Sequence, residues 1–301
     1  MPTADLAERL AERTLELVDV PSESRDEDGL AAHVLQVLRD NGISSSDAGD
    51  TCVLAGATER SDRPLVLLAG HLDTVPAQAN RPGRRVDGHI EGLGTCDMKG
   101  SLAVMLELAI AGAGGAVDLG YVFFGREELP VTESALTPLL EREPGLLDAD
   151  LVVMMEPTAN AVQAGCLGNI NARWIFRGRS AHSGRPWLGD NAIHRGGAGI
   201  SAIAAVPPEE HDFDGLRFTE VVSVTHVQGG IAQNVIPDAC VAHVNYRYAP
   251  GRSAADAEAR LRGWCEPHGT VDIIGNAPSA PVAGANPLVR AFEVLERFAC
   301  G

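Results

Sequence analysis

Four stretches of this sequence, most of them strongly apolar, run directly into acidic or imidazole side chains. A buried strand that ends in a charge is costly unless the charge is used at the end of the strand. In open α/β sheets the carboxyl ends of the strands are also where ligands bind. The pattern therefore predicts an α/β fold whose functional residues gather at one edge of a sheet. The stretches and the residues that follow them are 65–70 with His71 and Asp73, 92–96 with Asp97, 121–125 with Glu127 and Glu128, and 151–155 with Glu156.

These side chains are of the kinds that bind zinc in proteins. A neutral imidazole and several carboxylates can hold Zn²⁺, and a shared carboxylate can bridge two ions. His71 and Asp73 project to the same side of an extended chain, so Asp73 can hold the second N–H of a metal-binding His71. Asp97 lies in a glycine-rich loop and is suited to bridge. The structural alternatives are a salt-bridged surface pair for His71 and Asp73 and a helix N-cap for Asp97.

Glu127 and Glu128 are adjacent carboxylates that follow an apolar strand. Side by side they repel one another, which raises one pKa unless a cation lies between them. One can therefore bind metal while the other acts as general base toward a water molecule. An exposed acidic turn is the structural alternative. Glu156 adds a carboxylate at another strand end, where Pro157 stops the strand.

The sequence is expected to form a catalytic domain over residues 1–170, an inserted lid and dimerisation domain over 171–284, and an incomplete return to the catalytic domain over 285–301. In the first part, apolar runs alternate with helical patterns, which predicts a largely parallel sheet covered on both faces. The second part has the order β-α-β-β-α-β of a small α+β, ferredoxin-like domain. In the first part we expect helices at 3–17, 28–41, 101–111 and 132–142 and strands at 64–70, 119–125 and 151–155. In the second part we expect strands at 171–177, 217–228, 240–248 and 270–274 and helices at 190–205 and 253–265, followed by a last helix at 287–299.

Composition limits the partners and the compartment. The 301 residues carry a formal net charge of −17, which repels nucleic acid and anionic membrane surfaces. No run reaches the roughly 18 apolar residues of a membrane span, and residues 1–17 have a charged, amphipathic pattern rather than that of an export signal. The six cysteines form no CxxC pair and are expected to be free thiols in a reducing cytoplasm.

The strings GHLDTVP at 70–76, GLGTCDMKG at 92–100, FFGREEL at 123–129 and MMEPT at 154–158 resemble a family of co-catalytic zinc metallopeptidases and deacylases. This family includes aminoacylases, carboxypeptidase G, acetylornithine deacetylase and succinyl-diaminopimelate desuccinylase, and the resemblance covers about residues 5–300. It implies two zinc ions per subunit, for which cobalt can substitute. It also implies the roles of six residues: His71 and Glu156 hold one zinc, Asp97 bridges, Glu128 helps to hold the second zinc, Glu127 is the general acid and base, and Asp73 supports the ligands.

The second part of the chain continues the resemblance. AHSGRPWLGDNAIH at 181–194 is most similar to the actinobacterial type of succinyl-diaminopimelate desuccinylase, and His182 takes the place of a histidine that stabilises the oxyanion from the partner subunit. GGIAQNVIP at 229–237 matches a substrate-facing loop with Asn234 as donor, and Arg247 suits a bidentate grip on a carboxylate. The resemblance implies a homodimer through the inserted domain and a small N-acyl amino acid substrate. An exposed loop position for His182 and a strand-edge ion pair for Arg247 are the structural alternatives.

One ligand of the family has no counterpart in this sequence. The family's last zinc ligand is a histidine downstream of the return to the catalytic domain, and this chain ends before it, so we expect a C-terminally truncated chain of uncertain activity. The expected reaction is hydrolysis of N-succinyl-LL-2,6-diaminopimelate to succinate and diaminopimelate, in lysine and cell-wall biosynthesis. Acetylornithine deacetylase or another N-acyl-amino-acid deacylase is the enzymatic alternative. A truncated, non-catalytic metal- or amino-acid-binding protein is the alternative of another class.

Overall fold

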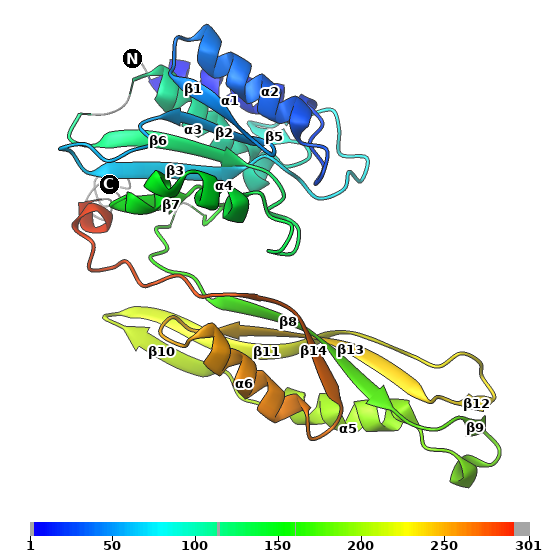
Figure 1. The fold of residues 1–301 in the computed structure, drawn as a ribbon. Coiled ribbons are helices and arrows are strands. Elements are labelled where there is room, and N and C mark those ends of the chain that lie inside the picture. The colour runs from blue at the N-terminus through cyan, green and yellow to red at the C-terminus, as the bar shows by residue number, and fades with distance from the viewer. Residues whose placement is uncertain (1–2, 113–114, 160, 292–301) are drawn as a thin grey trace. The chain divides into compact units, whose positions relative to one another are not determined.

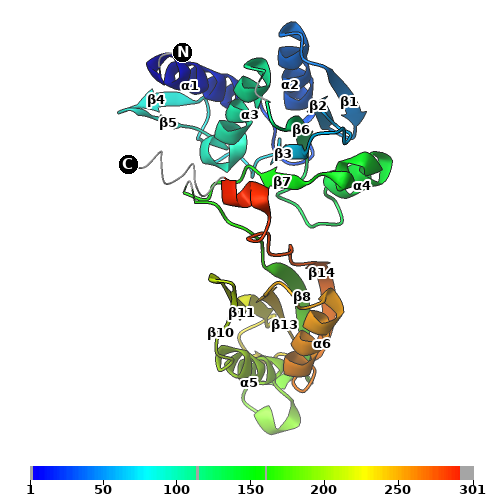
Figure 2. The same cartoon turned by 90° about the vertical axis from the view of Figure 1, so that its left-hand side faces the viewer.

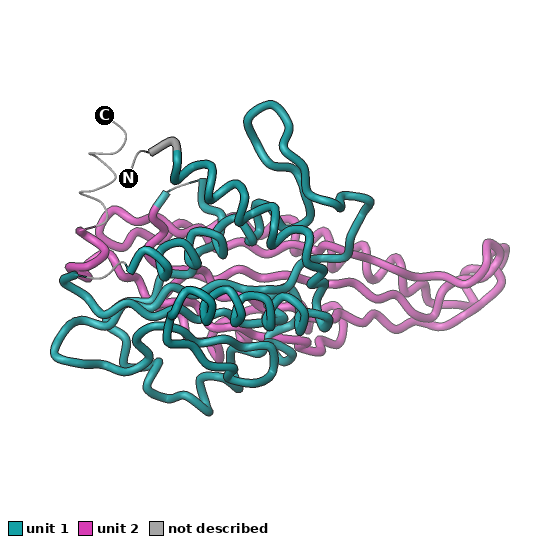
Figure 3. The backbone as a smooth tube through the Cα atoms, turned by 90° about the horizontal axis from the view of Figure 1, so that it is seen from above, with its two compact units in different colours: residues 1–161 teal, residues 162–301 magenta. Residues whose placement is uncertain are grey.

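The computed structural model describes residues 3–112, 115–159 and 161–291. The chain forms two compact units, residues 1–161 and residues 162–301 (Figure 3). The predicted domain boundaries after residues 170 and 284 remain predictions. Of the predicted last helix, residues 287–291 are helical, and the remainder lies outside the described residues.

A five-stranded sheet lies at the centre of the first unit. Its strands are β1 (Ser45–Gly49), β2 (Cys52–Gly56), β3 (Leu65–His71), β6 (Asp118–Phe124) and β7 (Leu151–Met154). They lie in the order β1-β2-β6-β3-β7 (Figure 1), with β3 parallel to β6 and β7, and with β2 antiparallel to both β6 and β1. The sheet is therefore mixed, and the expectation of a largely parallel sheet is wrong on its β1–β2 side. The β1–β2 hairpin was not predicted because β1 is polar and lacks the apolar run of a core strand.

Helices cover both faces of this sheet (Figures 1 and 2). On one face lie α1 (Thr3–Asp19), α2 (Asp28–Asp40) and α3 (Gly100–Ile110), and on the other lie α4 (Leu136–Arg142) and η2 (Pro144–Asp148). Successive side chains of a strand point to opposite faces, so Leu68 of β3 packs with the first group and Leu67 with the second. Helix α4 begins later than predicted, because residues 130–134 form turns in which Glu133 N–H donates to the Pro130 carbonyl. Between β3 and α3 lie a short hairpin, β4 (Arg84–Val86) and β5 (His89–Glu91), and a tight turn, η1 (Thr95–Lys99).

The second unit contains an antiparallel sheet with two helices. Its elements are β8 (Gly168–Arg177), β9 (Ala181–His182), η3 (Pro186–Leu188), α5 (Ala192–Ala204), β10 (Glu209–Phe213), β11 (Leu216–Gly229), β12 (Val235–Ile236), β13 (Ala239–Tyr248), α6 (Ala254–Cys265) and β14 (Thr270–Ala277). The strand order β11-β13-β8-β14 is that of the predicted ferredoxin-like domain, and β10 adds an edge strand that was not predicted. Strands β9 and β12 form a separate ribbon.

One face of this second sheet is covered by α5 and α6. Trp174 of β8 and Tyr246 of β13 are fully buried in a single cluster with Ile203 of α5 and Leu261 of α6. Ser253 caps α6 as predicted, because its hydroxyl accepts the N–H of Asp256. The predicted α/β fold with an inserted α+β domain is confirmed.

Two expectations from composition can be compared with the described residues. None of the helices seen there is long and apolar enough to cross a membrane. The five cysteines described are free thiols, as expected: Cys52, Cys96, Cys166, Cys240 and Cys265.

Candidate metal centre

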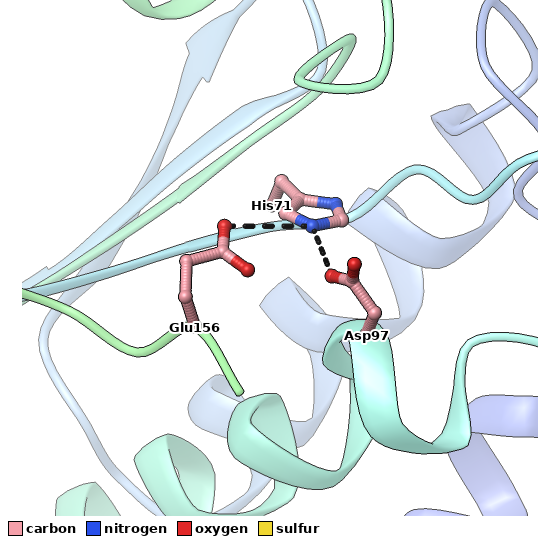
Figure 4. Close-up of side chains that lie close together, drawn as sticks. All are labelled: His71, Asp97 and Glu156. Carbon is pink, nitrogen blue, oxygen red and sulfur yellow. Dashed lines mark hydrogen bonds and ion pairs between the residues drawn. The ribbon is translucent and has the colours of Figure 1, made fainter. Parts of the chain in front are cut away.

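His71, Asp97 and Glu156 converge at the carboxyl ends of the parallel strands (Figure 4). The Nε2 atom of His71 lies 2.9 Å from Asp97 Oδ1 and 3.7 Å from Glu156 Oε1. One potential ligand atom from each residue lies within 4.8 Å of the others. An imidazole nitrogen and two carboxylates form the kind of three-ligand set that holds a catalytic zinc ion, with a water molecule as the fourth ligand.

Two neighbouring parallel strands bring His71 and Glu156 together. His71 is the last residue of β3, and the main chain after β7 continues alongside it, since Met155 N–H donates to the Ala69 carbonyl. Glu156 is the next residue along the chain. The parallel pairing of β3 and β7 therefore delivers both side chains to one edge, as the strand-end pattern predicts.

Asp97 reaches the same edge from the turn η1. Gly94 has a φ of +72°, and a Cβ atom there would lie 2.6 Å from the Thr74 side chain, so the turn requires glycine at this position. Met98 is buried, and its sulfur lies 3.2 Å from the main-chain nitrogen of His71. Helix α3 begins only at Gly100, with Lys99 at the N-cap position, so the interpretation of Asp97 as a helix cap is wrong.

Asp73 is completely buried and binds the segment that carries the two glutamates. Its carboxylate accepts the main-chain N–H groups of Glu127 at 2.8 Å and Glu128 at 3.1 Å, and the Ser24 hydroxyl at 2.8 Å. The Nδ1 atom of His71 lies 2.9 Å from the Asp73 carbonyl oxygen and 3.5 Å from its carboxylate. The main chain of Asp73 is therefore the nearer partner of the imidazole, and its carboxylate chiefly orients Glu127 and Glu128.

The Asp73 carboxyl is held in its charged form by these contacts. Burial by itself would raise its pKa, but the hydrogen bonds from His71, Glu127 N–H, Ser24 and Glu128 N–H hold the pKa below its usual range. The ionised carboxylate can then accept the Glu127 N–H, the Glu128 N–H and the Ser24 hydroxyl at once. Sequence reasoning missed Ser24, because nothing in the local pattern connects it with a residue 49 positions away.

Negative charge accumulates at this edge of the sheet. Burial raises the pKa of Glu156, His71 opposes the rise, and Asp97 and Glu127 add to it, so that the pKa reaches about 7. Burial lowers the pKa of His71, but Asp73, Glu156 and Asp97 together raise it to about 9. A proton on His71 thus offsets part of the negative charge, and a divalent cation among these ligands would take over that role. The charge balance and the donor atoms both fit a metal ion.

Glu127 and Glu128 lie beside this group. Desolvation is the largest cause of a raised pKa at both residues, and the negative charge of Asp97 adds to it. Glu128 does not form a second three-residue ligand group with Asp97 within the described part of the chain. The described residues therefore bring one group of three candidate ligands together at this edge, with two further acids next to it.

In the second unit, His182 and Asn234 are neighbours on the β9–β12 ribbon. Val235 pairs with His182, and the Ser183 N–H donates to the Asn234 carbonyl at 2.9 Å. The Gly184 N–H donates to Nδ1 of His182 at 3.0 Å, so the proton of a neutral imidazole lies on Nε2. The exposed His182 side chain can therefore act as a hydrogen-bond donor.

Arg247 lies at the other end of the second unit's sheet. It is near the end of β13, about 27 Å from Ala239 at the usual rise of a strand, whereas the β9–β12 ribbon adjoins the Ala239 end. Its Nε donates to Asn245 Oδ1 at 3.1 Å, and no ion pair of Arg247 is found among the described residues. Within one chain, Arg247 is therefore not brought together with His182 and Asn234.

Comparison with known proteins places the chain in a family. A family profile described as a peptidase dimerisation domain, of the M20 type, matches residues 165–273. A putative succinyl-diaminopimelate desuccinylase of Mycobacterium tuberculosis is 42% identical over 248 residues, which cover 82% of this chain and 70% of the relative. The chain belongs to the M20 metallopeptidase family. The succinyl-diaminopimelate desuccinylase of Corynebacterium glutamicum, also similar to this M20 chain, is 37% identical over 81% of the chain and 67% of its own length.

Solved structures agree with the fold of an M20 protein. The aminopeptidase PepT of Bacillus cereus matches with a TM-score of 0.68 at 20% identity, covering 94% of this chain and 80% of that one. A dinuclear metal-binding M20 peptidase of Bacillus subtilis, YXEP, matches with a TM-score of 0.59 at 18% identity, covering 93% and 76%. The family expected from the sequence motifs is confirmed.

Proposed function

We propose that the protein is a metal-dependent amide hydrolase that converts N-succinyl-LL-2,6-diaminopimelate and water into succinate and LL-2,6-diaminopimelate, in the cytoplasm. The observation that carries the proposal is the His71, Asp97 and Glu156 group in a chain 42% identical to a relative of that name. The reaction would serve lysine and cell-wall biosynthesis.

The geometry of the site supports His71, Asp97 and Glu156 as metal ligands, and the family resemblance adds Glu128. His71, Asp97 and Glu156 would hold one zinc or cobalt ion, and Asp97 with Glu128 would contribute to a second. Bound zinc would polarise the amide carbonyl and make water more acidic. Glu127 would accept the proton of the attacking water and deliver it to the leaving amine, since its raised pKa suits a group that must both take and release a proton. Asp73 would hold Glu127 in place through its main-chain N–H.

The second unit would supply the groups that recognise the substrate. The Nε2–H of His182 would stabilise the developing oxyanion, and Asn234 beside it would donate to the substrate. Arg247 would bind a substrate carboxylate, because its terminal nitrogens are not used by the hydrogen bond to Asn245. Since His182 and Arg247 lie at opposite ends of this unit, we propose that a given site takes them from two different chains.

A homodimer would bring those chains together. Strand β10 pairs only with residues 216–220 of β11, so the outer edge of residues 221–229 has no strand beside it within the described residues. Val221 and Val227 on this segment and Ile193 on α5 are exposed apolar side chains. An open edge next to apolar side chains suits antiparallel pairing with a second copy.

A substrate panel tests the function. The zinc-loaded protein should hydrolyse the succinylated substrate with a kcat/KM about 10- to 100-fold above that for acetylornithine, because a hydrogen-bonded carboxylate adds about 1.5–3 kcal/mol. A preference for acetylornithine would make the chain another deacylase. Metal binding without turnover of any acylated amino acid would make it a binding protein.

A further inference from the structure

Lys99 is a buried cation that the proposed mechanism does not use. Its side chain is 1% exposed, and its Nζ donates to the main-chain carbonyls of Leu17 at 3.0 Å and Val20 at 2.8 Å. Both carbonyls belong to the C-terminal end of α1 and the residues after it, where a positive group is favourable. An ammonium and a neutral amine can each donate to both carbonyls, so both hydrogen bonds can form whether or not Lys99 is protonated.

The same residue closes the turn that presents Asp97. The Lys99 N–H donates to the Gly94 carbonyl at 2.8 Å, which spans the turn with Asp97 inside it. On the sheet side, the turn is fixed by Met98, whose sulfur contacts the His71 main chain. On the helix side it is fixed by the Lys99 side chain. Half of the Asp97 side chain is exposed, so its position depends on how the turn is held rather than on packing around the carboxylate.

We propose that Lys99 is a positioning residue of the metal centre, which ties the Asp97 turn to the end of α1 and thereby sets the distance between the Asp97 carboxylate and His71. The inference rests on the proposed role of Asp97 as a metal ligand. Residues that orient metal ligands from outside typically change metal affinity by about 10- to 100-fold when they are lost. A residue that merely stabilises α1 would change stability without this effect on the metal.

The test compares Lys99→Met with a control variant that should lower the stability of the first unit without affecting the metal site. Methionine keeps an unbranched side chain but removes the donors. Leu139→Ala is the control, because Leu139 is fully buried on the opposite face of the sheet, in the cluster of α4. Zinc affinity is measured by competition with a chromophoric chelator, and Tm is measured on the metal-free proteins. We expect Lys99→Met to weaken zinc binding about 10- to 100-fold, and Leu139→Ala to lower Tm with zinc affinity changed less than about 2-fold.

A double-mutant cycle shows whether Lys99 acts through Asp97. In an Asp97→Asn background, Lys99→Met should change zinc affinity by less than about 3-fold, because the ligand to be positioned is already lost. Unchanged affinity in the single variant, or an equal loss in both backgrounds, overturns the inference. If Lys99→Met does not fold, Lys99→Gln, which retains one donor group, should show an intermediate loss, and wild-type affinity would count against the proposal. If Asp97→Asn itself binds zinc with wild-type affinity, Asp97 is not a metal ligand, and the ligand set of the proposed function is wrong.

Discussion

Asp73→Asn should lower both the stability of the first unit and the catalytic rate, because the Asp73 carboxylate anchors two glutamates and a serine. Its Oδ1 accepts Glu127 N–H, and its Oδ2 accepts Glu128 N–H and the Ser24 hydroxyl. An asparagine has one acceptor oxygen, so in either orientation its NH₂ group faces at least one donor. Loss of one hydrogen bond to a charged acceptor costs about 1.5–3 kcal/mol of the free energy of unfolding. Displacement of Glu127 should also lower kcat about 10- to 100-fold.

Urea unfolding of the metal-free protein, followed by far-UV circular dichroism, measures the change in stability. The three tryptophans all lie in residues 162–301, so their fluorescence follows the second unit and provides an internal control that should not move. Ser24→Ala is the matched variant: it removes one donor and leaves both glutamate contacts, so it should cost about 1 kcal/mol and lose less activity. An Asp73→Asn protein within about 0.5 kcal/mol of the wild type and with normal kcat would refute the anchoring role.

Four further outcomes are expected. Glu127→Gln should retain zinc and lose most turnover, since the amide cannot accept a proton, and a normal kcat would remove Glu127 from the mechanism. His182→Ala should lower kcat by roughly 10²-fold or more at unchanged zinc content. If His182 acts across a dimer, mixing this variant with Glu127→Gln should restore activity. Subunit exchange without restored activity would contradict a role of His182 in the partner's site. Metal analysis after dialysis should find about one zinc per chain, bound by His71, Asp97 and Glu156, because arginines already pair with the acids of the second candidate group, Glu209, His211 and Glu220. Glu220 is buried, and although burial alone would raise its pKa, hydrogen bonds from Arg252, Tyr246 and Ala249 N–H hold the pKa below its usual range. The pKa of Glu220 is therefore lower in the folded than in the unfolded protein. Its contribution to the free energy of unfolding is present above the unfolded pKa near 4.5 and is lost as the pH falls through the folded pKa. Tryptophan-monitored unfolding should show this loss of stability at low pH, and Glu220→Gln should reduce the pH dependence.

The grouping of His71, Asp97 and Glu156 could be predicted from the sequence because it depends on local patterns. An apolar run that ends in a charge identifies a strand end, and parallel neighbours such as β3 and β7 bring their ends to one edge. The hairpin of β1 and β2 and the edge strand β10 were missed for the opposite reason. β10 is the polar segment Glu209–Phe213, which has no strong apolar alternation, and its strand form comes from pairing with β11.

The geometry of the centre was not accessible from the sequence, because it is set by contacts between distant residues. Lys99 and Leu17 are 82 positions apart, and no local spacing links a lysine in a glycine-rich turn with the end of the first helix. Such contacts arise only when the packed sheet and helices bring their backbones together. An isolated H-x-D or D-x-K motif therefore identifies residues that could bind a metal but does not predict where their side chains lie. For Asp97, whose side chain is half exposed, position must come from its turn, and the turn is held by Met98 against the sheet and by Lys99 against α1. Metal affinity in this protein should then depend on residues that never touch the ion as well as on the ligands that do.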